Sequence, residues 1–312
     1  MAKYFKILLF AVLIAVVAGI FLDIFWNNPQ AEGFFTVERG DNVLQIASNL
    51  KNQGYIGSRL MFVWDAVTSG NFKKMKAGRY LIKKGSTSKD LIEKFTKFQS
   101  VPINILIAPG KTTNDIARIL AQARLVKKDE FLDLVLGVGL EGYLFPDSYL
   151  IDPIATQEDI VKQFLNNFDK KLTKNLREEI KKQKRTVFDI ITMASILEKE
   201  VKTDNDKKIV AGILWKRVEN NLPLQVDSTL LYFLTSQHPS LVDKNVESLY
   251  NTYKYAGLPI GPICNPGIES IMGAIYPKNS DYWFYLSAPS GETIFAPTLG
   301  QHLINKAKYL TN

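Results

Sequence analysis

Cysteine and histidine are scarce in this chain of 312 residues, which contains one cysteine, Cys264, and two histidines, His238 and His302. A single thiol excludes an internal disulfide and any metal site built from several cysteines. The two histidines lie far apart in the sequence, and neither belongs to a metal-ligand motif. We therefore expect neither a metal ion nor any other cofactor, and no nucleophilic pair of cysteine and histidine.

Long hydrophobic runs are also rare, because only one stretch is long and uncharged enough to enter a membrane. Lys3 and Lys6 precede the uncharged run Ile7–Leu22, and Ile24–Trp26 can extend it toward the roughly 20 residues that cross a bilayer. A cleavable signal peptide is the competing interpretation, but no small-residue cleavage site closes the run. Since the lysines predict a cytoplasmic start, we expect residues 1–26 to be a retained single-pass anchor in the cell inner (plasma) membrane, with the rest of the chain on the extracytoplasmic (periplasmic) side.

Basic residues form no dominant run, although 39 lysines and arginines outnumber 31 aspartates and glutamates and give a net charge of +8. Aromatic residues are not interleaved with basic ones as in proteins that stack on bases, so we expect no nucleic-acid partner. The positive charge suits an anionic surface, such as a membrane face or a carboxylate-rich wall polymer. The hydrophobic fraction of 46% is ordinary for a globular protein, and the length leaves room for two compact domains.

The stretch Thr186–Val201, TVFDIITMASILEKEV, predicts an amphipathic helix that begins with a capping box of Thr186 and Asp189. At about 100° per residue its apolar residues fall on one arc; Glu198 lies inside that arc, whereas Glu200 points to the opposite side. A carboxyl group among apolar neighbours has a raised pKa, as a general acid near neutral pH requires. The pattern therefore makes Glu198 the candidate catalytic acid. The alternative is a helix-end glutamate shielded by neighbouring lysines.

Residues 31–100 show the pattern of a small βααβ unit. A strand in FFTVE is followed by a Gly-Asp turn, a helix with Ile46 and Ala47, a second helix at Ser58–Thr68 and a strand at Ala77–Ile82. This unit resembles LysM modules, a family that binds glycans containing N-acetylglucosamine. A purely structural role for the unit is the alternative.

Two shorter motifs add carboxyl and amide groups. In LPLQVDST, residues 222–229, apolar and polar residues alternate, so an extended segment places Gln225 and Asp227 on one side. Asp227 can instead serve only to cap the next helix, and the two roles are compatible. In LEGYLFPDSYLI, residues 140–151, the carboxyl group of Glu141 lies among aromatic and apolar residues, which is typical of a buried turn with satisfied carboxylates.

A further stretch, residues 250–277, contains four of the 13 prolines and four of the 19 glycines. Its first half cannot be a regular helix or strand, so we expect a shaped loop, a common place for a binding surface. Asn251, Tyr253 and Asn265 supply neutral hydrogen-bonding groups and a ring, which suit a sugar better than a charged ligand. Asn265 is also expected to cap the helix that follows.

Taken together, ASILEKE, LQVDST, YNTY followed by GLPIGPICNPG, and EGYLFPDSY resemble the motifs of the YceG-like family, whose members are membrane-anchored endolytic murein transglycosylases. The resemblance covers nearly the whole chain after the anchor. It implies an α+β fold in which one transmembrane helix is followed by the small LysM-like βααβ subdomain and a larger mixed α+β catalytic domain, residues 101–312.

By this resemblance, Glu198 matches the single catalytic glutamate of the family. The residues expected to bind substrate in its cleft are Gln225, Asp227, Asn251, Tyr253, Asn265 and Glu141. The implied reaction cleaves the β-1,4 bond between N-acetylmuramic acid and N-acetylglucosamine in nascent peptidoglycan strands and leaves 1,6-anhydro-muramic ends. The resemblance also implies that the enzyme ends glycan elongation beside the peptidoglycan synthases.

Two other classes of function remain open. The chain can be a non-catalytic, membrane-tethered peptidoglycan-binding protein in which Glu198 only supports the fold. It can also be a hydrolase, since ordinary glycoside hydrolysis uses two carboxylates and Asp227 or Glu141 is available as the second one.

Overall fold

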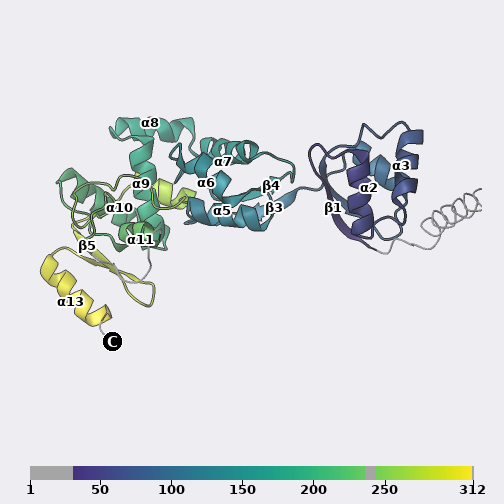
Figure 1. Ribbon diagram of the computed structural model, residues 1–312. Helices are drawn as coiled ribbons and strands as arrows, with labels where there is room; N and C mark the ends of the chain where they lie inside the picture. Colours follow the sequence, from purple (N-terminus) through teal and green to yellow (C-terminus); the bar gives the residue numbers. More distant parts are fainter. Residues whose placement is uncertain (1–30, 236–243, 311–312) are drawn as a thin grey trace, which may run out of the picture. The chain divides into compact units, whose positions relative to one another are not determined.

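The computed structural model describes residues 31–235 and 244–310, which form a mixed α+β protein as the sequence predicts (Figure 1). Twelve helices and three two-stranded sheets lie within these residues. The predicted membrane anchor, residues 1–26, lies outside them. No helix of the described part is both long and apolar enough to cross a membrane.

The chain divides into two compact units, and the first is built on an antiparallel pair of strands. The elements in this part of the chain are β1 (Gly33–Val37), α2 (Val43–Asn52), α3 (Arg59–Thr68), β2 (Gly78–Ile82) and α4 (Ser88–Thr96). Phe35 of β1 lies opposite Tyr80 of β2, and both side chains are fully buried with Phe62 and Phe95. The predicted order of strand, helix, helix and strand is therefore present.

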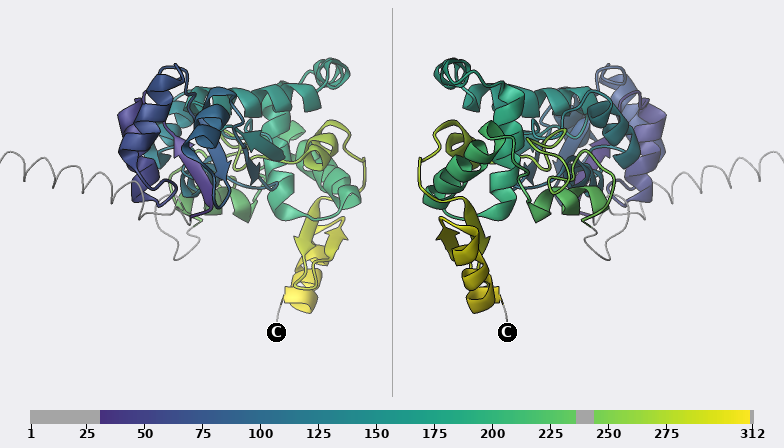
Figure 2. Two further views of the ribbon diagram at one scale, coloured as in Figure 1. Left: turned by 90° about the vertical axis from the view of Figure 1, so that its right-hand side faces the viewer. Right: turned by 90° about the vertical axis from the view of Figure 1, so that its left-hand side faces the viewer.

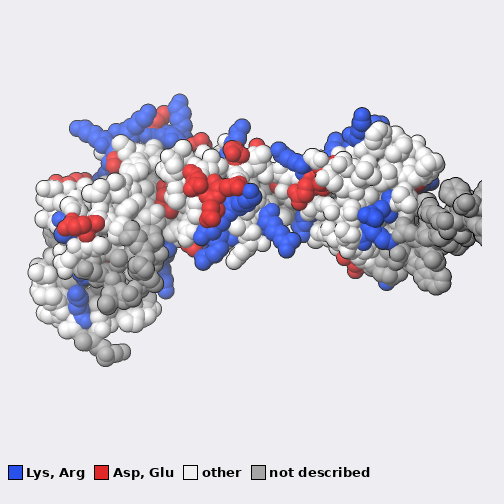
Figure 3. Space-filling view, viewed as in Figure 1, with Lys and Arg blue, Asp and Glu red and all other residues white. Residues whose placement is uncertain are grey.

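The second unit comprises residues 105–149 and 156–312 and is mostly helical. Its helices are α5 (Thr113–Gln122), α6 (Lys128–Leu136), α7 (Gln157–Lys171), α8 (Lys174–Lys182), α9 (Val187–Glu200), α10 (Asp204–Glu219), α11 (Asp227–Thr235), α12 (Ile268–Ile275) and α13 (Leu299–Leu310). A short ladder joins β3 (Ile103–Leu106) to β4 (Ser148–Ile151). The surface helix α8 carries Lys174, Arg177, Lys181 and Lys182, and Figure 3 shows a group of blue side chains over this helix.

At the centre of the second unit lies α9, which packs against α8, α10, α11 and α12. Eight consecutive residues, Ile190–Leu197, are buried, so the helix is enclosed on nearly all sides. Burial of this much apolar surface fixes the direction in which the last turn of α9 presents its side chains.

Local sequence signals explain where the helices begin. In five helices the side chain of the cap accepts a hydrogen bond from the backbone of the third helical residue, whose own side chain accepts one from the cap. The cap residues are Asn42 (α2), Thr87 (α4), Thr112 (α5), Thr156 (α7) and Thr186 (α9). The capping box predicted for Thr186 and Asp189 is confirmed.

Gly212 of α10 allows the segment that contains Lys278 to cross this helix at close range. Lys278 donates its backbone N–H to the carbonyl oxygen of Lys208 over 2.8 Å, which brings its own carbonyl oxygen against Gly212. A Cβ atom at position 212 would lie only 2.0 Å from that oxygen. The crossing leads the chain from α12 toward the C-terminal hairpin.

This hairpin pairs β5 (Phe284–Ser287) with β6 (Thr293–Ala296) and is followed by α13. α13 packs against both strands. Figure 2 shows the hairpin and α13 in yellow at one end of the second unit. They form one wall of the pocket described next.

Candidate active site

A pocket of about 310 Å³ opens in the second unit between the end of α9, the segment that leads into α11, the β5 strand and α13. Its lining combines two carboxyl groups, two cationic side chains, an amide, an imidazole and several aromatic rings. These polar and aromatic residues are Glu200, Asp227, Arg217, Lys306, Gln225, His302, Tyr253, Trp283, Phe284 and Tyr285. Rings that flank hydrogen-bonding groups suit an uncharged, ring-shaped ligand such as a sugar.

Glu200 ends α9 and projects its side chain into this pocket. Burial raises the pKa of the Glu200 carboxyl group, and the negative charge of Asp227 raises it further. Hydrogen bonds from Ser228 lower this pKa and so limit the shift. The hydroxyl of Tyr285 approaches Oε2 of Glu200 at 3.4 Å as a donor. A carboxyl group that stays protonated closer to neutral pH is suited to general acid catalysis.

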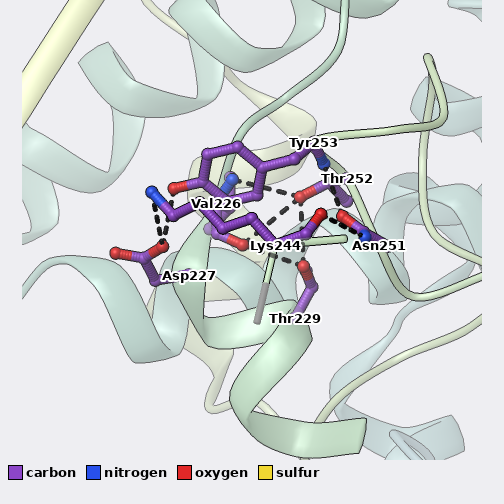
Figure 4. Close-up of polar contacts among 7 residues, drawn as sticks. All are labelled: Val226, Asp227, Thr229, Lys244, Asn251, Thr252 and Tyr253. Carbon is purple, nitrogen blue, oxygen red and sulfur yellow. Dashed lines mark hydrogen bonds and ion pairs between the residues drawn. The ribbon is translucent and has the colours of Figure 1, made fainter. Parts of the chain in front are cut away.

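Asp227 faces the same pocket and is held by two neighbours (Figure 4). Tyr253 donates its hydroxyl to Oδ1 of Asp227 over 2.6 Å, and Nζ of Lys244 lies 3.9 Å from the same oxygen. Lys244 also lies over the Tyr253 ring, 4.2 Å from its centroid. Because 61% of the Asp227 side chain is exposed, the ion pair adds little stability and leaves the carboxylate accessible to a ligand.

A hydrogen-bonded scaffold fixes the segment before α11. The carbonyl oxygen of Thr252 accepts from Gln225 N over 2.9 Å, and its hydroxyl accepts from Val226 N over 3.1 Å. This hydroxyl lies 3.0 Å from that of Thr229, and Figure 4 shows the two groups facing each other. Thr252, one of the neutral polar residues of the predicted loop, thus ties this loop to the pocket wall.

Asn251 belongs to this scaffold rather than to the pocket. Its Nδ2 donates to the carbonyl oxygens of Lys244 and Val246 at 2.9 and 2.8 Å, and its Oδ1 accepts from Tyr253 N at 3.0 Å. The residue is fully buried. The amide of Asn251 is thus occupied in shaping the loop, and its role in substrate binding stays a prediction.

Gln225 lines the pocket in an unusual backbone conformation, with a φ of +58°. Its Oε1 accepts from Nη2 of Arg217 over 3.0 Å, and the same guanidinium donates to the carbonyl oxygens of Pro223 and Trp283 at 2.9 and 3.2 Å. With its oxygen engaged, the Gln225 side chain has its NH₂ group left as a donor. Left-handed backbone at a residue other than glycine is costly and is often found at functional sites.

Glu198 lies outside the pocket. Its Oε2 accepts from Gly267 N at 2.9 Å and from the Ser270 hydroxyl at 2.6 Å, and Nζ of Lys207 is 3.8 Å away. The side chain is 13% exposed, so the predicted burial is correct, but the predicted apolar surroundings are wrong. The start of α12 supplies donors there, and a helix N-terminus favours a carboxylate.

Glu141 is also enclosed away from the pocket. Thr113 N donates to both of its carboxyl oxygens at 3.1 Å, and Tyr232 and Asn265 donate to one oxygen each at 3.1 Å. Burial raises the pKa of Glu141 to about 7, and the hydrogen bonds of Thr113 and Tyr232 limit the shift. The prediction that Glu141 binds substrate is not supported by these contacts, because both oxygens already serve the fold.

Asn265 is likewise a structural residue, fully buried beside Glu141. Its Oδ1 accepts from Leu144 N at 2.8 Å, and its Nδ2 donates to the carbonyl oxygen of Lys111 at 2.9 Å. The predicted capping role is wrong, since Gly267 occupies the cap position of α12. Both amide N–H donors of Asn265 and one acceptor position are used within the fold, and its role in the cleft stays a prediction.

Comparison with known proteins identifies the family of the chain. The model of the YceG-like family matches residues 35–308. The chain belongs to the YceG-like family. A relative from Bacillus subtilis (strain 168), named endolytic murein transglycosylase, is 31% identical over 306 residues, covering 88% of this chain and 84% of the relative.

Two further relatives extend the comparison. A protein of the same name from Streptococcus pneumoniae serotype 2 is 28% identical over 321 residues, which cover 88% of this chain but 58% of the longer relative. The 2.6 Å crystal structure of a YceG-like protein from Listeria monocytogenes superposes with a TM-score of 0.60 at 28% identity. That match covers 88% of this chain and 98% of the other.

In this YceG-like protein, the structure brings together only part of the predicted site. Gln225, Asp227 and Tyr253 line one pocket. The other four predicted residues, Glu198, Glu141, Asn251 and Asn265, hold the surrounding fold. Sequence reasoning missed Glu200, although it lies in the same EKE motif, and it missed the wall formed by the aromatic run DYWFY and α13.

Proposed function

We propose that this protein is an endolytic murein transglycosylase that cleaves the β-1,4 bond between N-acetylmuramic acid and N-acetylglucosamine. The observation that carries the proposal is the desolvated carboxyl group of Glu200 in a pocket lined by rings and hydrogen-bonding groups. The relatives that bear this name, at 31% and 28% identity over most of the chain, support it independently.

In the proposed reaction Glu200 acts first as an acid and then as a base. Its protonated carboxyl group donates to the glycosidic oxygen, and the bond from that oxygen to C1 of the muramic residue breaks. The carboxylate then accepts the proton of the muramic C6 hydroxyl, whose oxygen forms a bond to C1. The products are a free C4 hydroxyl on N-acetylglucosamine and a 1,6-anhydro-muramic end. Glu200 regains its proton and no water is consumed.

Other groups of the pocket have supporting roles in this proposal. Positive charge develops at C1 as the glycosidic bond breaks, and the carboxylate of Asp227 is the anion available to stabilise it. Tyr253 fixes the direction of Asp227 through its hydroxyl. The NH₂ group of Gln225 is suited to a hydroxyl or N-acetyl oxygen of the sugar.

We choose Glu200 rather than the predicted Glu198 as the acid because the three predicted pocket residues lie with Glu200. The contacts of Glu198 suit a positioning role, since they join the last turn of α9 to the start of α12. A proton donor must reach the substrate, and only Glu200 of this pair lines the pocket.

A two-carboxylate hydrolase is the second candidate, because Asp227 lines the same pocket as Glu200. Digestion of purified peptidoglycan by the full chain in detergent, followed by mass spectrometry of the fragments, distinguishes the alternatives. Anhydro-muramic ends support the transglycosylase, and reducing ends support the hydrolase. A protein that binds the polymer without releasing fragments is the non-catalytic binding protein, and this result would contradict the proposal.

We also propose that residues 1–26 anchor the protein in the plasma membrane and leave both compact units on the extracytoplasmic side, where nascent strands are made. This rests on the single uncharged run after two lysines. There the LysM-like unit would hold the glycan while the second unit ends elongation beside the synthases. Protease added to intact spheroplasts should digest the folded part, whereas protection of that part would contradict this orientation.

A further inference from the structure

The C-terminal helix α13 contributes an imidazole to the pocket. His302 lines it together with Lys306 and Leu310 of the same helix. The imidazole stacks on Phe284 of β5, with ring centroids 5.2 Å apart and planes inclined by 23°. This stacking restrains the plane of the imidazole.

The two nitrogens of His302 have different surroundings. Nδ1 is buried, and no group of the described residues hydrogen-bonds to it, whereas Nε2 is not sealed in this way. An N–H at Nδ1 would be a buried donor without an acceptor, which costs about 1–3 kcal/mol. The proton of a neutral imidazole is therefore expected on Nε2, the nitrogen with access to open space.

The charges around His302 favour this neutral form. Burial lowers the pKa of the imidazole, and the positive charges of Lys306 and Arg217 lower it further. At neutral pH the ring thus presents one N–H donor and no charge. Such a donor matches an uncharged acceptor oxygen, and a sugar with N-acetyl and hydroxyl groups offers several.

We propose that His302 is a substrate-binding residue that donates from Nε2 to an uncharged oxygen of the bound amino sugar. The inference rests on the proposed function, since it places the sugar in the pocket of Glu200. In this proposal α13 contributes to the binding site in addition to packing against the hairpin.

The test compares two substitutions of His302 with a control on the same helix, all in the full chain purified in detergent. His302→Phe keeps a ring to stack on Phe284 and removes the donor, whereas His302→Gln keeps a donor. Leu303→Gln is the matched control, because Leu303 is 56% exposed and does not line the pocket. The readouts are kcat and KM on peptidoglycan strands, binding of an N-acetylglucosamine oligomer by calorimetry, and the melting temperature.

We expect His302→Phe to lower kcat/KM by about 5- to 100-fold, mainly through KM, and to weaken oligomer binding by a similar factor. His302→Gln should recover most of this loss, and Leu303→Gln should match the wild type. Unchanged kcat/KM and unchanged oligomer binding in His302→Phe would overturn the inference. Equal losses of kcat/KM in His302→Phe and His302→Gln, in proportion to their lowered melting temperatures, would overturn it as well. If the wild type binds the oligomer through His302 but releases no fragments, the proposed reaction fails and the inference stands. If it neither binds nor cleaves, both fail.

Discussion

Glu198 and Glu200 lie in the same last turn of α9, yet their carboxyl groups face different surroundings. Glu198 accepts hydrogen bonds from Gly267 N and Ser270 at the start of α12, whereas Glu200 enters the pocket. One carboxyl group thus fixes the end of the helix and the other is available for chemistry. The opposite directions follow from helix geometry, because residues two apart differ by about 200° around the axis.

Substituting the two glutamates separately tests these assignments. Glu200→Gln should lower kcat by about 10²–10⁴-fold with little loss of stability, because an amide cannot transfer the proton. Glu198→Gln should instead lower the free energy of unfolding by about 3 kcal/mol, since it leaves the buried Lys207 without its counter-ion. Kinetics on peptidoglycan together with thermal unfolding of both variants checks this. The reverse pattern would restore Glu198 as the acid.

Glu200 also predicts how activity depends on pH. Its pKa is raised by burial first and by Asp227 in addition, and the protonated form is the one that donates. The rate should therefore fall as the pH rises through this pKa. Asp227→Asn removes one cause of the raised pKa, so the alkaline limb of its pH–rate profile should move to lower pH. An unchanged alkaline limb in this variant would show that Glu200 does not control it.

The start of α9 could be predicted from the sequence because a capping box and an apolar arc are local signals. The face of α9 that meets the pocket could not, because it depends on partners distant in the chain. Ser270 reaches Glu198 from 72 residues away, and Tyr285 reaches Glu200 from 85. The periodicity of apolar residues identified the buried side of α9 correctly. It does not reveal that polar groups of α12 surround this side at the last turn, where Glu198 lies.

The predicted amides show the same limit. Asn251 and Asn265 were selected because neutral hydrogen-bonding groups suit sugars, and both are fully buried in backbone contacts. In a loop rich in proline and glycine, the amide of an asparagine can hydrogen-bond to irregular backbone as readily as to a ligand. Tyr253 differs because its hydroxyl extends to the pocket residue Asp227. Composition alone does not separate these roles.

Glu141 should make stability depend on pH. Its pKa is raised from 4.5 to about 7 in the folded protein, chiefly by burial. Folding therefore favours the protonated form, and its contribution of about 3 kcal/mol is complete below pH 4.5 and is lost as the pH rises to about 7. Urea unfolding of the wild type and Glu141→Gln at pH 4.5 and 8 measures this. Between pH 4.5 and pH 8 the Glu141→Gln variant should lose less free energy of unfolding than the wild type. Equal losses in the two proteins would exclude Glu141 as the cause of the pH dependence.

Two glycines provide a matched test of the crossing at α10. Gly212→Ala places a Cβ 2.0 Å from the carbonyl oxygen of Lys278, so the chain must move and we expect a loss of about 3 kcal/mol or more. Gly300→Ala in α13 meets nothing within 4 Å and should be neutral or stabilising by up to about 1 kcal/mol. Chemical unfolding of both variants gives the comparison. A Gly212→Ala protein as stable as Gly300→Ala would contradict the close approach.

Gln225 allows backbone strain and side-chain function to be separated, because its φ of +58° favours glycine while its side chain lines the pocket. Gln225→Gly and Gln225→Ala both remove the amide and its bond to Arg217, so both should lower kcat/KM by about 10-fold. They should differ in stability, since glycine adopts this φ without strain and alanine does not. We expect Gln225→Gly to be about 1 kcal/mol more stable than Gln225→Ala. Equal stability of the two would mean that the backbone is not held in the left-handed region, and wild-type activity in either would remove Gln225 from the binding site.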